Sequence, residues 1–228
     1  MVSPAPRPAR ARSPEEKGQR RDDILRAAER LWTSTPYAEL SMNQVAREAQ
    51  LAKGTLYLYF DTKEELFLAL LTEHLGRWLE QVTALLDERQ PRTPEGAAEV
   101  LIQSARDQEP LRRLLILLGT VLERNVRPEL ALNFKREFRR MVQGVLERLP
   151  FAPEVTLRLL MHMYALSLGW QQLTEEPPAA SLLRREADLA FLFPSFEQEF
   201  AFSLRAVIDR LVAEAPAAAE APSRKSLA

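Results

Sequence analysis

The chain has 228 residues, a formal net charge of -1 and a hydrophobic content of 46%, enough for one large domain or two small ones with a substantial core. Cysteine is absent, which excludes disulfides, thiol catalysis and thiolate metal sites and fits a reducing cytoplasm. The two histidines, His74 and His162, lie far apart in sequence, so we expect no metal site, no cofactor and no His-dependent enzyme. No apolar run reaches the roughly 18 residues that a membrane-spanning helix needs.

Both ends of the chain are rich in Pro, Ala and charged residues and poor in large apolar ones. We expect a disordered arm at residues 1–13 and a disordered tail at 215–228, because such segments cannot bury enough apolar surface to fold. Arg7, Arg10 and Arg12 could enter a DNA minor groove. A simple charged tail is the default alternative.

Helix-start signals recur between these ends. Proline is tolerated in the first helical turn, where its missing N–H costs nothing, and suitable prolines occur at Pro14, Pro94, Pro110, Pro128 and Pro153. Ser41 with Gln44 and Thr62 with Glu65 match the capping-box pattern. No stretch shows strand alternation, so an all-α fold is expected. The predicted helices are 14–34, 41–48, 53–60, 62–88, 94–108, 110–125, 128–149, 153–175 and 195–214.

The segment 41–60, SMNQVAREAQLAKGTLYLYF, contains two of the four tyrosines of the chain. Val45, Ala46 and Ala49 share one face of its first helix, and Leu56 lies on the inward face of the second. Two short helices packed in this way predict a helix-turn-helix, with the second helix presented outward.

The outward side of this second helix carries residues suited to DNA. Lys53 can reach guanine acceptors or phosphate, Thr55 a phosphate or a base edge, and Tyr57 a thymine methyl or phosphate. Gly54 allows close approach of the backbone. An ordinary helical hairpin is the alternative, but a core segment would not need these side chains.

The stretch KGTLYLYFDTKEEL at 53–66, with LSMNQVAREAQL and DDILRAAERLW before it, resembles the DNA-binding domain of the TetR family of transcriptional regulators. The resemblance covers residues 20–78. It implies a three-helix DNA-binding domain at 14–61, extending to about 78 with the start of the linking helix. Residues 62–214 would then form a helical domain for effector binding and dimerisation. One departure is Gln50, where the family often has Gly in the turn.

The resemblance also implies roles for individual residues. Ser41 would cap its helix and contact a phosphate, Tyr59 would give its hydroxyl to the DNA backbone, and Lys63 would hold a phosphate at a helix N-terminus. Lys53, Thr55 and Tyr57 would face the major groove. The full predicted DNA-binding set is Ser41, Asn43, Ala52, Lys53, Gly54, Thr55, Tyr57, Tyr59 and Lys63.

Two late helices have unusually broad apolar surfaces. Between Leu159 and Trp170 only His162 and Ser167 interrupt an apolar run, and helix 195–214 repeats large apolar residues. A helix that is apolar all round must be covered all round, so we expect these two helices to form a four-helix interface with a second copy. Central core helices of a monomer are the alternative. The predicted interface residues are Leu166, Phe200, Leu204 and Leu211.

An effector cavity for a mainly apolar compound is expected among helices 94–175. Its candidate lining residues are Trp78, Phe134, Phe138, Met141, Met161, His162, Tyr164 and Trp170. Aromatic and Met stripes are more often plain core than pocket. His162 is singled out because an imidazole in apolar surroundings needs a polar partner.

The sequence therefore favours a homodimeric regulator that binds a near-palindromic double-stranded operator and is released by a small, mainly apolar effector. A repressor is the expected form, although an activator has the same residue signals. The alternatives are a helical-bundle adaptor and a constitutive DNA binder without a ligand switch. An all-α enzyme is disfavoured because no nucleophile–base pair is present.

Overall fold

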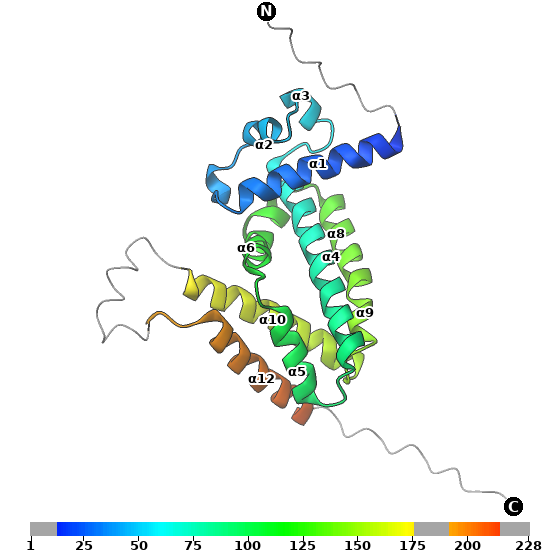
Figure 1. The fold of residues 1–228 in the computed structure, drawn as a ribbon, viewed down its shortest axis with the longest axis vertical. Coiled ribbons are helices and arrows are strands. Elements are labelled where there is room, and N and C mark those ends of the chain that lie inside the picture. Colours follow the sequence, from blue (N-terminus) through cyan, green and yellow to red (C-terminus); the bar gives the residue numbers. More distant parts are fainter. Residues whose placement is uncertain (1–12, 176–191, 215–228) are drawn as a thin grey trace, which may run out of the picture. The chain divides into compact units, whose positions relative to one another are not determined.

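The computed structural model describes residues 13–175 and 192–214, and all regular structure within them is helical (Figure 1). The all-α prediction is thus confirmed. Apart from Ser13, the predicted arm with its arginines and the predicted tail lie outside the described residues. In chain order the elements are α1 (Pro14–Trp32), η1 (Tyr37–Glu39), α2 (Met42–Glu48), α3 (Lys53–Leu56), α4 (Lys63–Arg89), α5 (Pro94–Ser104), α6 (Glu109–Leu117), η2 (Leu118–Leu122), α7 (Glu123–Asn125), α8 (Pro128–Met141), α9 (Gln143–Leu146), α10 (Pro153–Thr174) and α12 (Phe196–Glu214).

Several predicted helices are shorter or more broken than expected, among them 94–108, which ends at Ser104. The predicted helix 53–60 is α-helical only as far as Leu56 and continues as turns, and the predicted helix 110–125 contains the π-helical segment η2. The predicted helix 128–149 breaks between α8 and α9. Gly144 lies just after this break, where a Cβ atom would come within 3.3 Å of Thr83 Oγ1, so the glycine permits a close approach while weakening the helix.

The described residues form two compact units. Unit 1 comprises residues 13–80 and 108–142, and unit 2 comprises 81–107, 143–175 and 192–214. Helix α4 contributes to both. The predicted DNA-binding domain, 14–61 with an extension to about 78, lies within unit 1, which also includes segment 108–142.

The core of unit 1 is built around Phe67 of α4, which is fully buried. Its ring meets Trp32 of α1 edge-on at a centroid distance of 5.4 Å and Tyr37 of η1 at 4.9 Å. The same apolar cluster includes Leu114 of α6 and Phe134 of α8. The helix-turn-helix therefore shares one continuous core with the α6–α8 segment of its unit.

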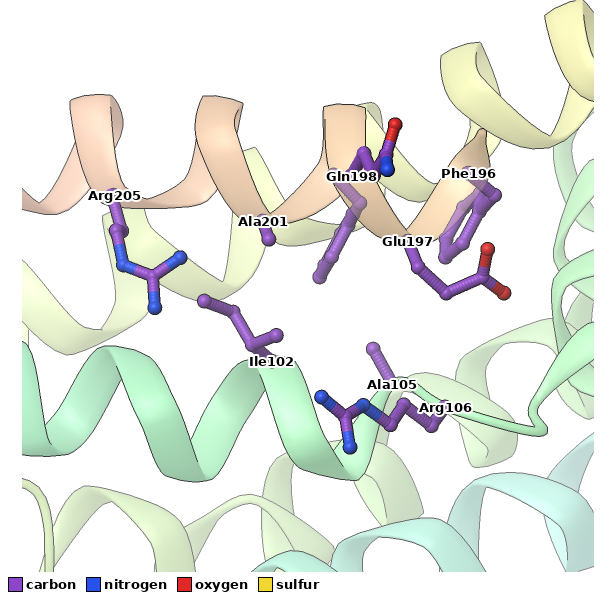
Figure 2. A pocket seen from close by; sticks show the side chains of 9 residues that line it. Ile102, Ala105, Arg106, Phe196, Glu197, Gln198, Ala201 and Arg205 are labelled. Atoms are coloured by element: carbon purple, nitrogen blue, oxygen red, sulfur yellow. The ribbon is translucent and has the colours of Figure 1, made fainter. Parts of the chain in front are cut away.

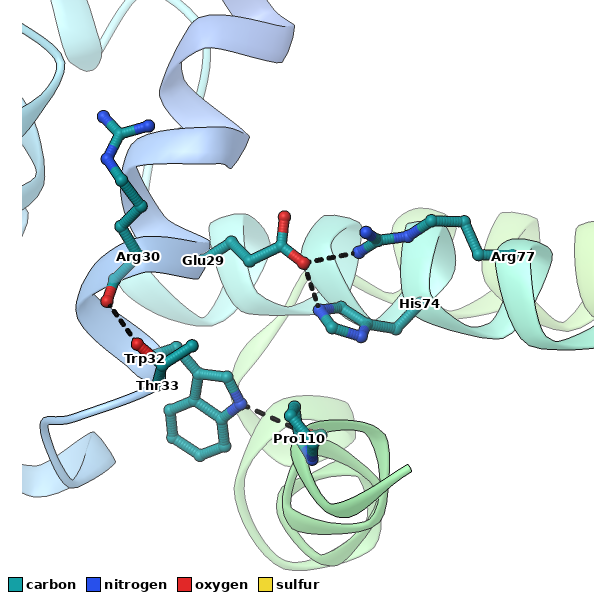
Figure 3. Close-up of polar contacts among 7 residues, drawn as sticks. All are labelled: Glu29, Arg30, Trp32, Thr33, His74, Arg77 and Pro110. Atoms are coloured by element: carbon teal, nitrogen blue, oxygen red, sulfur yellow. Dashed lines mark hydrogen bonds and ion pairs between the residues drawn. The ribbon is translucent and has the colours of Figure 1, made fainter. Parts of the chain in front are cut away.

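Polar contacts reinforce this shared core. Trp32 Nε1 donates to the carbonyl oxygen of Pro110 at 3.3 Å (Figure 3), and the Arg113 guanidinium lies 4.3 Å from the centroid of the Trp32 ring. Arg127, the N-cap residue of α8, donates through Nε to Glu65 at 2.9 Å, and Glu65 also accepts the backbone N–H of Asp61. Both α6 and the start of α8 are thereby tied to the elements that hold the helix-turn-helix.

In unit 2, α12 packs against both α10 and α5 (Figure 1). Its buried face carries Phe200, Leu204 and Leu211, of which Phe200 is 1% exposed. The sequence prediction of these three as dimer contacts is wrong for this structure, because their side chains are already enclosed within their own chain. Leu166 of α10 is half-buried.

Large apolar side chains on the other faces of α10 and α12 remain exposed. Met161 is 65% exposed and Phe202 is 73% exposed, with Leu157, Leu173 and Val212 also exposed on the same two helices. The expected excess of apolar surface on these two helices is therefore present. It lies on residues other than those predicted from the sequence. Among the described helices none combines the length and apolar character needed to cross a membrane.

His74 of α4 is largely buried against α1, where its Nε2 lies 3.2 Å from Glu29 Oε1 (Figure 3). Arg77 Nη2 contacts the same oxygen of Glu29 at 2.7 Å. Burial lowers the pKa of His74 below its ordinary value, Arg77 adds to the lowering, and Glu29 opposes it. The folded chain thus holds this imidazole in its neutral form more strongly than the unfolded chain does.

We predict that His74 makes the protein less stable as the pH falls. Since the folded pKa lies below the ordinary value of 6.5, the unfolded chain takes up the proton first, and the free energy of unfolding drops below that pH. Chemical denaturation of wild type and His74→Gln should give free energies of unfolding that diverge as the pH falls below 6.5, by at most about 1.4 kcal/mol for each pH unit. His162→Gln, which removes the other, exposed histidine, is the control and should follow wild type. Parallel curves for wild type and His74→Gln would contradict this prediction.

Candidate nucleic-acid interface

The first helix of the motif, α2, is fixed at its start by a complete capping box. Ser41 Oγ accepts the backbone N–H of Gln44 at 3.3 Å, and the Gln44 side chain accepts the backbone N–H of Ser41 at 2.8 Å. Met42, Val45 and Ala46 of α2 are buried. Asn43 is exposed, and so is the Ser41 side chain. The capping prediction for Ser41 is confirmed, and the residue still faces solvent.

The turn between α2 and α3 is tight and includes a left-handed residue. Gln50 has φ 57°, and the following residue, Leu51, donates its N–H to the Ala46 carbonyl at 2.8 Å. This is the closing geometry of a helix that ends in a left-handed residue. The position thus has the conformation that favours Gly.

Helix α3 presents a group of small and cationic residues outward. Ala52, Lys53, Gly54 and Tyr57 are exposed, and Thr55 is half-buried. The Lys53 ammonium lies 5.8 Å from the centroid of the Tyr57 ring, so the two side chains form one patch. A Cβ atom added to Gly54 would meet nothing within 4 Å, which leaves its backbone open to a close partner.

Lys63 is less free than expected from the sequence, and the Tyr59 ring packs inward as the resemblance implied. The half-buried Tyr59 packs against the core of unit 1. Lys63 Nζ donates to the carbonyl oxygens of Tyr37 and Leu40, at 2.7 and 2.9 Å, and lies 3.7 Å from the Tyr37 ring centroid. Burial lowers the pKa of Lys63, while Glu64 acts in the opposite direction. Lys63 therefore holds the loop before α2 to the start of α4, a role that the motif did not indicate.

Leu58 is an exposed residue of the motif that sequence reasoning missed. Its side chain is 69% exposed, more than the 39% of Tyr57 beside it. Leu58 lies four residues after the exposed Gly54, and this helical spacing was the available signal for its outward position. An apolar side chain of this kind adds a surface that fits thymine methyls rather than phosphates.

The predicted effector residues fall into two groups. Trp78, Phe134, Phe138 and Met141 lie in unit 1, where Phe134 is buried and the others pack against the core. Met161, His162, Tyr164 and Trp170 lie in unit 2. His162 is exposed, so the expectation that it lies in apolar surroundings is wrong, and Trp170 Nε1 donates to Ser203 Oγ at 3.1 Å.

Two family models match the chain and together cover most of it. Residues 24–70 match "Bacterial regulatory proteins, tetR family", and residues 72–215 match "Tetracyclin repressor-like, C-terminal domain". The chain belongs to the TetR family. Members of this family are DNA-binding transcriptional regulators.

Similar proteins agree with this membership. An uncharacterized HTH-type transcriptional regulator of Mycobacterium tuberculosis (strain CDC 1551 / Oshkosh) is 35% identical over 104 residues, which are 44% of this chain and 41% of that protein. A TetR regulator from Rhodococcus sp. RHA1 has a TM-score of 0.54 at 19% identity, covering 88% of this chain and 100% of that one.

Thermus thermophilus FadR, a TetR-family repressor solved with lauroyl-CoA, gives a TM-score of 0.53 at 20% identity, covering 89% of this chain and 98% of that one. The two solved structures support the TetR fold. The chain spans less than half the length of its curated M. tuberculosis relative.

We predict that Gln50→Gly stabilises the protein. The wild-type residue pays the steric cost of a left-handed conformation, and Gly removes that cost, so the free energy of unfolding should rise by about 1 kcal/mol. The control is Gln50→Ala, which removes the same exposed side chain but keeps a Cβ atom and should give no such gain. Urea titrations measure both variants. Equal stabilities for the Gly and Ala variants would show that this turn is unstrained.

Proposed function

We propose that this TetR-family chain is a homodimeric, sequence-specific DNA-binding repressor that a small effector releases from a near-palindromic operator. The observation that carries the proposal is the exposed patch of α3, in which Lys53, Gly54 and Tyr57 lie together on the second helix of a helix-turn-helix. The match of residues 72–215 to a repressor-like C-terminal domain supports repression as the outcome.

Within this proposal, the patch reads bases and its surroundings hold the DNA backbone. Lys53 and Thr55 reach base edges or phosphates, and Tyr57 offers both a ring face for a thymine methyl and a hydroxyl for a phosphate. Ser41 and Asn43, exposed at the start of α2, face phosphates. The exposed residues Ala52 and Gly54 bring the backbone of α3 close to the duplex.

Tyr59 and Lys63 act at the edge of this interface. Tyr59 keeps its ring against the core while its hydroxyl is directed to a phosphate. Lys63 has three N–H donors and uses two of them on carbonyl oxygens, so one remains for a phosphate. Its contribution to binding is then largely to fix the loop before α2.

The second copy is proposed to cover the exposed apolar faces of α10 and α12. Phe202, Met161 and Leu157 are large apolar residues that a monomer would leave in water. Burying such side chains stabilises an interface by about 25 cal/mol for each Å² of apolar surface. In a dimer that reads two adjacent half-sites, the recognition helices lie about one helical turn, ~35 Å, apart on DNA.

The shared core of unit 1 offers a route from effector to DNA. The contacts of Trp32 with Pro110 and Arg113, and of Arg127 with Glu65, join α6 and α8 to the elements that hold the motif. An effector that binds one arrangement of these helices better than another shifts DNA affinity by that difference. Trp78, Phe134, Phe138 and Met141 line the core along this route.

We predict that Lys53→Ala and Tyr57→Ala weaken binding to the operator, because each removes an exposed contact of α3. Each loss should cost about 1–3 kcal/mol, or roughly fivefold to over a hundredfold in affinity, with unchanged helical content. Fluorescence anisotropy with an operator selected from random duplexes measures this effect. Arg139→Ala, an exposed change on α8, is the control. If the affinities of the α3 variants stay within twofold of wild type, α3 is not the helix that reads the operator.

We predict that Phe202→Glu or Met161→Glu converts the dimer into monomers, since each places a charge in a desolvated interface at a cost of several kcal/mol. Sedimentation velocity at micromolar concentration should show wild-type dimer and variant monomer. Glu99→Lys, an exposed charge change on α5, should remain dimeric. A monomeric wild type would show that this dimer does not form. Dimeric Glu variants would show that the interface lies elsewhere.

A further inference from the structure

Unit 2 contains a cavity of about 300 Å³ between the last turn of α5 and the first half of α12 (Figure 2). This volume is at the lower end of the range of about 300–1,000 Å³ for small-molecule sites. None of the eight effector residues predicted from the sequence lines it. The kind of ligand that fits this cavity therefore depends on a different set of residues.

One part of the lining is apolar. Ile102 of α5 and Ala105, the residue that follows this helix, lie across from Ala201 of α12, with Phe196 at the end of the cavity (Figure 2). Phe200 of α12 also lines the cavity. Small alanine side chains on both helices keep the cavity open. This surface suits a short hydrocarbon body rather than a polar solute.

The other part of the lining is cationic. Arg205 extends from α12 toward Ile102, and Arg106 lies along the end of α5 (Figure 2). Arg205 uses its Nε on Glu95 at 3.0 Å, which leaves its terminal N–H groups available. Within residues 13–175 and 192–214, Arg106 forms no ion pair. Guanidinium groups of this kind bind carboxylates through paired N–H donors.

The acidic residues near the cavity are engaged elsewhere. Glu197, which also lines it, accepts the hydroxyl of Ser195 at 3.1 Å, and Glu95 holds Arg205. A ligand with a positive head would meet two guanidinium groups and a single lining carboxylate, that of Glu197, so the balance of charge disfavours it. A neutral hydrocarbon would use only the apolar part of the lining and neither guanidinium group. One carboxylate on a short apolar body satisfies both parts of the lining.

We propose that the α5–α12 cavity binds a small amphipathic carboxylate, whose apolar body lies between Ile102 and Phe200 and whose carboxylate pairs with the guanidinium group of Arg106. This site goes beyond the proposed repressor function, because binding requires neither DNA nor any of the predicted effector residues. Its test is likewise made without DNA, so its outcome is separate from that of the operator experiments.

Isothermal titration of the full chain with octanoate, compared with octylamine and acetate, tests the proposal. We expect saturable binding of one octanoate per chain, and at least tenfold weaker binding of both the amine and acetate. Arg106→Gln should weaken octanoate binding at least tenfold, and Ala201→Leu should abolish it by filling the cavity. Arg210→Gln, which changes an arginine of α12 outside the cavity, should bind like wild type.

Thermal melting of each variant shows that it is folded, so that lost binding is not lost structure. Arg106 is exposed and has no ion pair to lose within the described ranges, so its substitution should leave the melting temperature close to that of wild type. Non-saturable binding of octanoate, equal affinity for octylamine, or unchanged affinity in folded Arg106→Gln and Ala201→Leu would overturn the proposal.

Discussion

The packing of Phe67 against Trp32 and Tyr37 is the contact on which the DNA-reading part of this chain depends. Phe67 is fully buried and brings three elements, α1, η1 and α4, to one point. Tyr37 is held further by its hydroxyl, which donates to Glu64 at 2.7 Å, and by the ammonium of Lys63 over its ring. Both of these partners come from the first turn of α4. The loop that leads into α2 is therefore fixed before any DNA is present.

The helix-turn-helix could be read from the sequence because its signals are local. The Ser41 capping box, the small Ala46 at the crossing and the outward Lys53 and Tyr57 all depend on neighbours within a few residues. The left-handed turn at Gln50 was foreseeable only through the family resemblance, since Gln itself does not favour it. The contacts of Lys63 with Tyr37 and Leu40 join residues 23 and 26 positions apart, and no local pattern indicated them.

The second half of the chain was predictable in helix content but not in which face each helix buries. The apolar stripe of helix 195–214 placed Phe200 on one face but did not indicate whether its own chain or a second copy covers that face. Phe200 is 1% exposed, whereas Phe202, which is not part of the stripe, is 73% exposed. His162 was expected inside because the residues around it are apolar on every side of the helix, and it is exposed. The α5–α12 cavity depends on two small residues, Ala105 and Ala201, which the fold brings together. No periodic pattern in the sequence indicated that they would lie near each other.

The shared core of unit 1 limits how this protein can be recombined with its relatives. Joining residues 13–61 to the remainder of another regulator would separate Phe67 and Leu114 from the α1 side chains that they cover. The grafted head would then lack part of its own interior and expose apolar surface. A transplantable reading head has to include α4 as far as residue 80 together with segment 108–142. In this chain, the portable unit for exchange of operator specificity is therefore discontinuous in sequence.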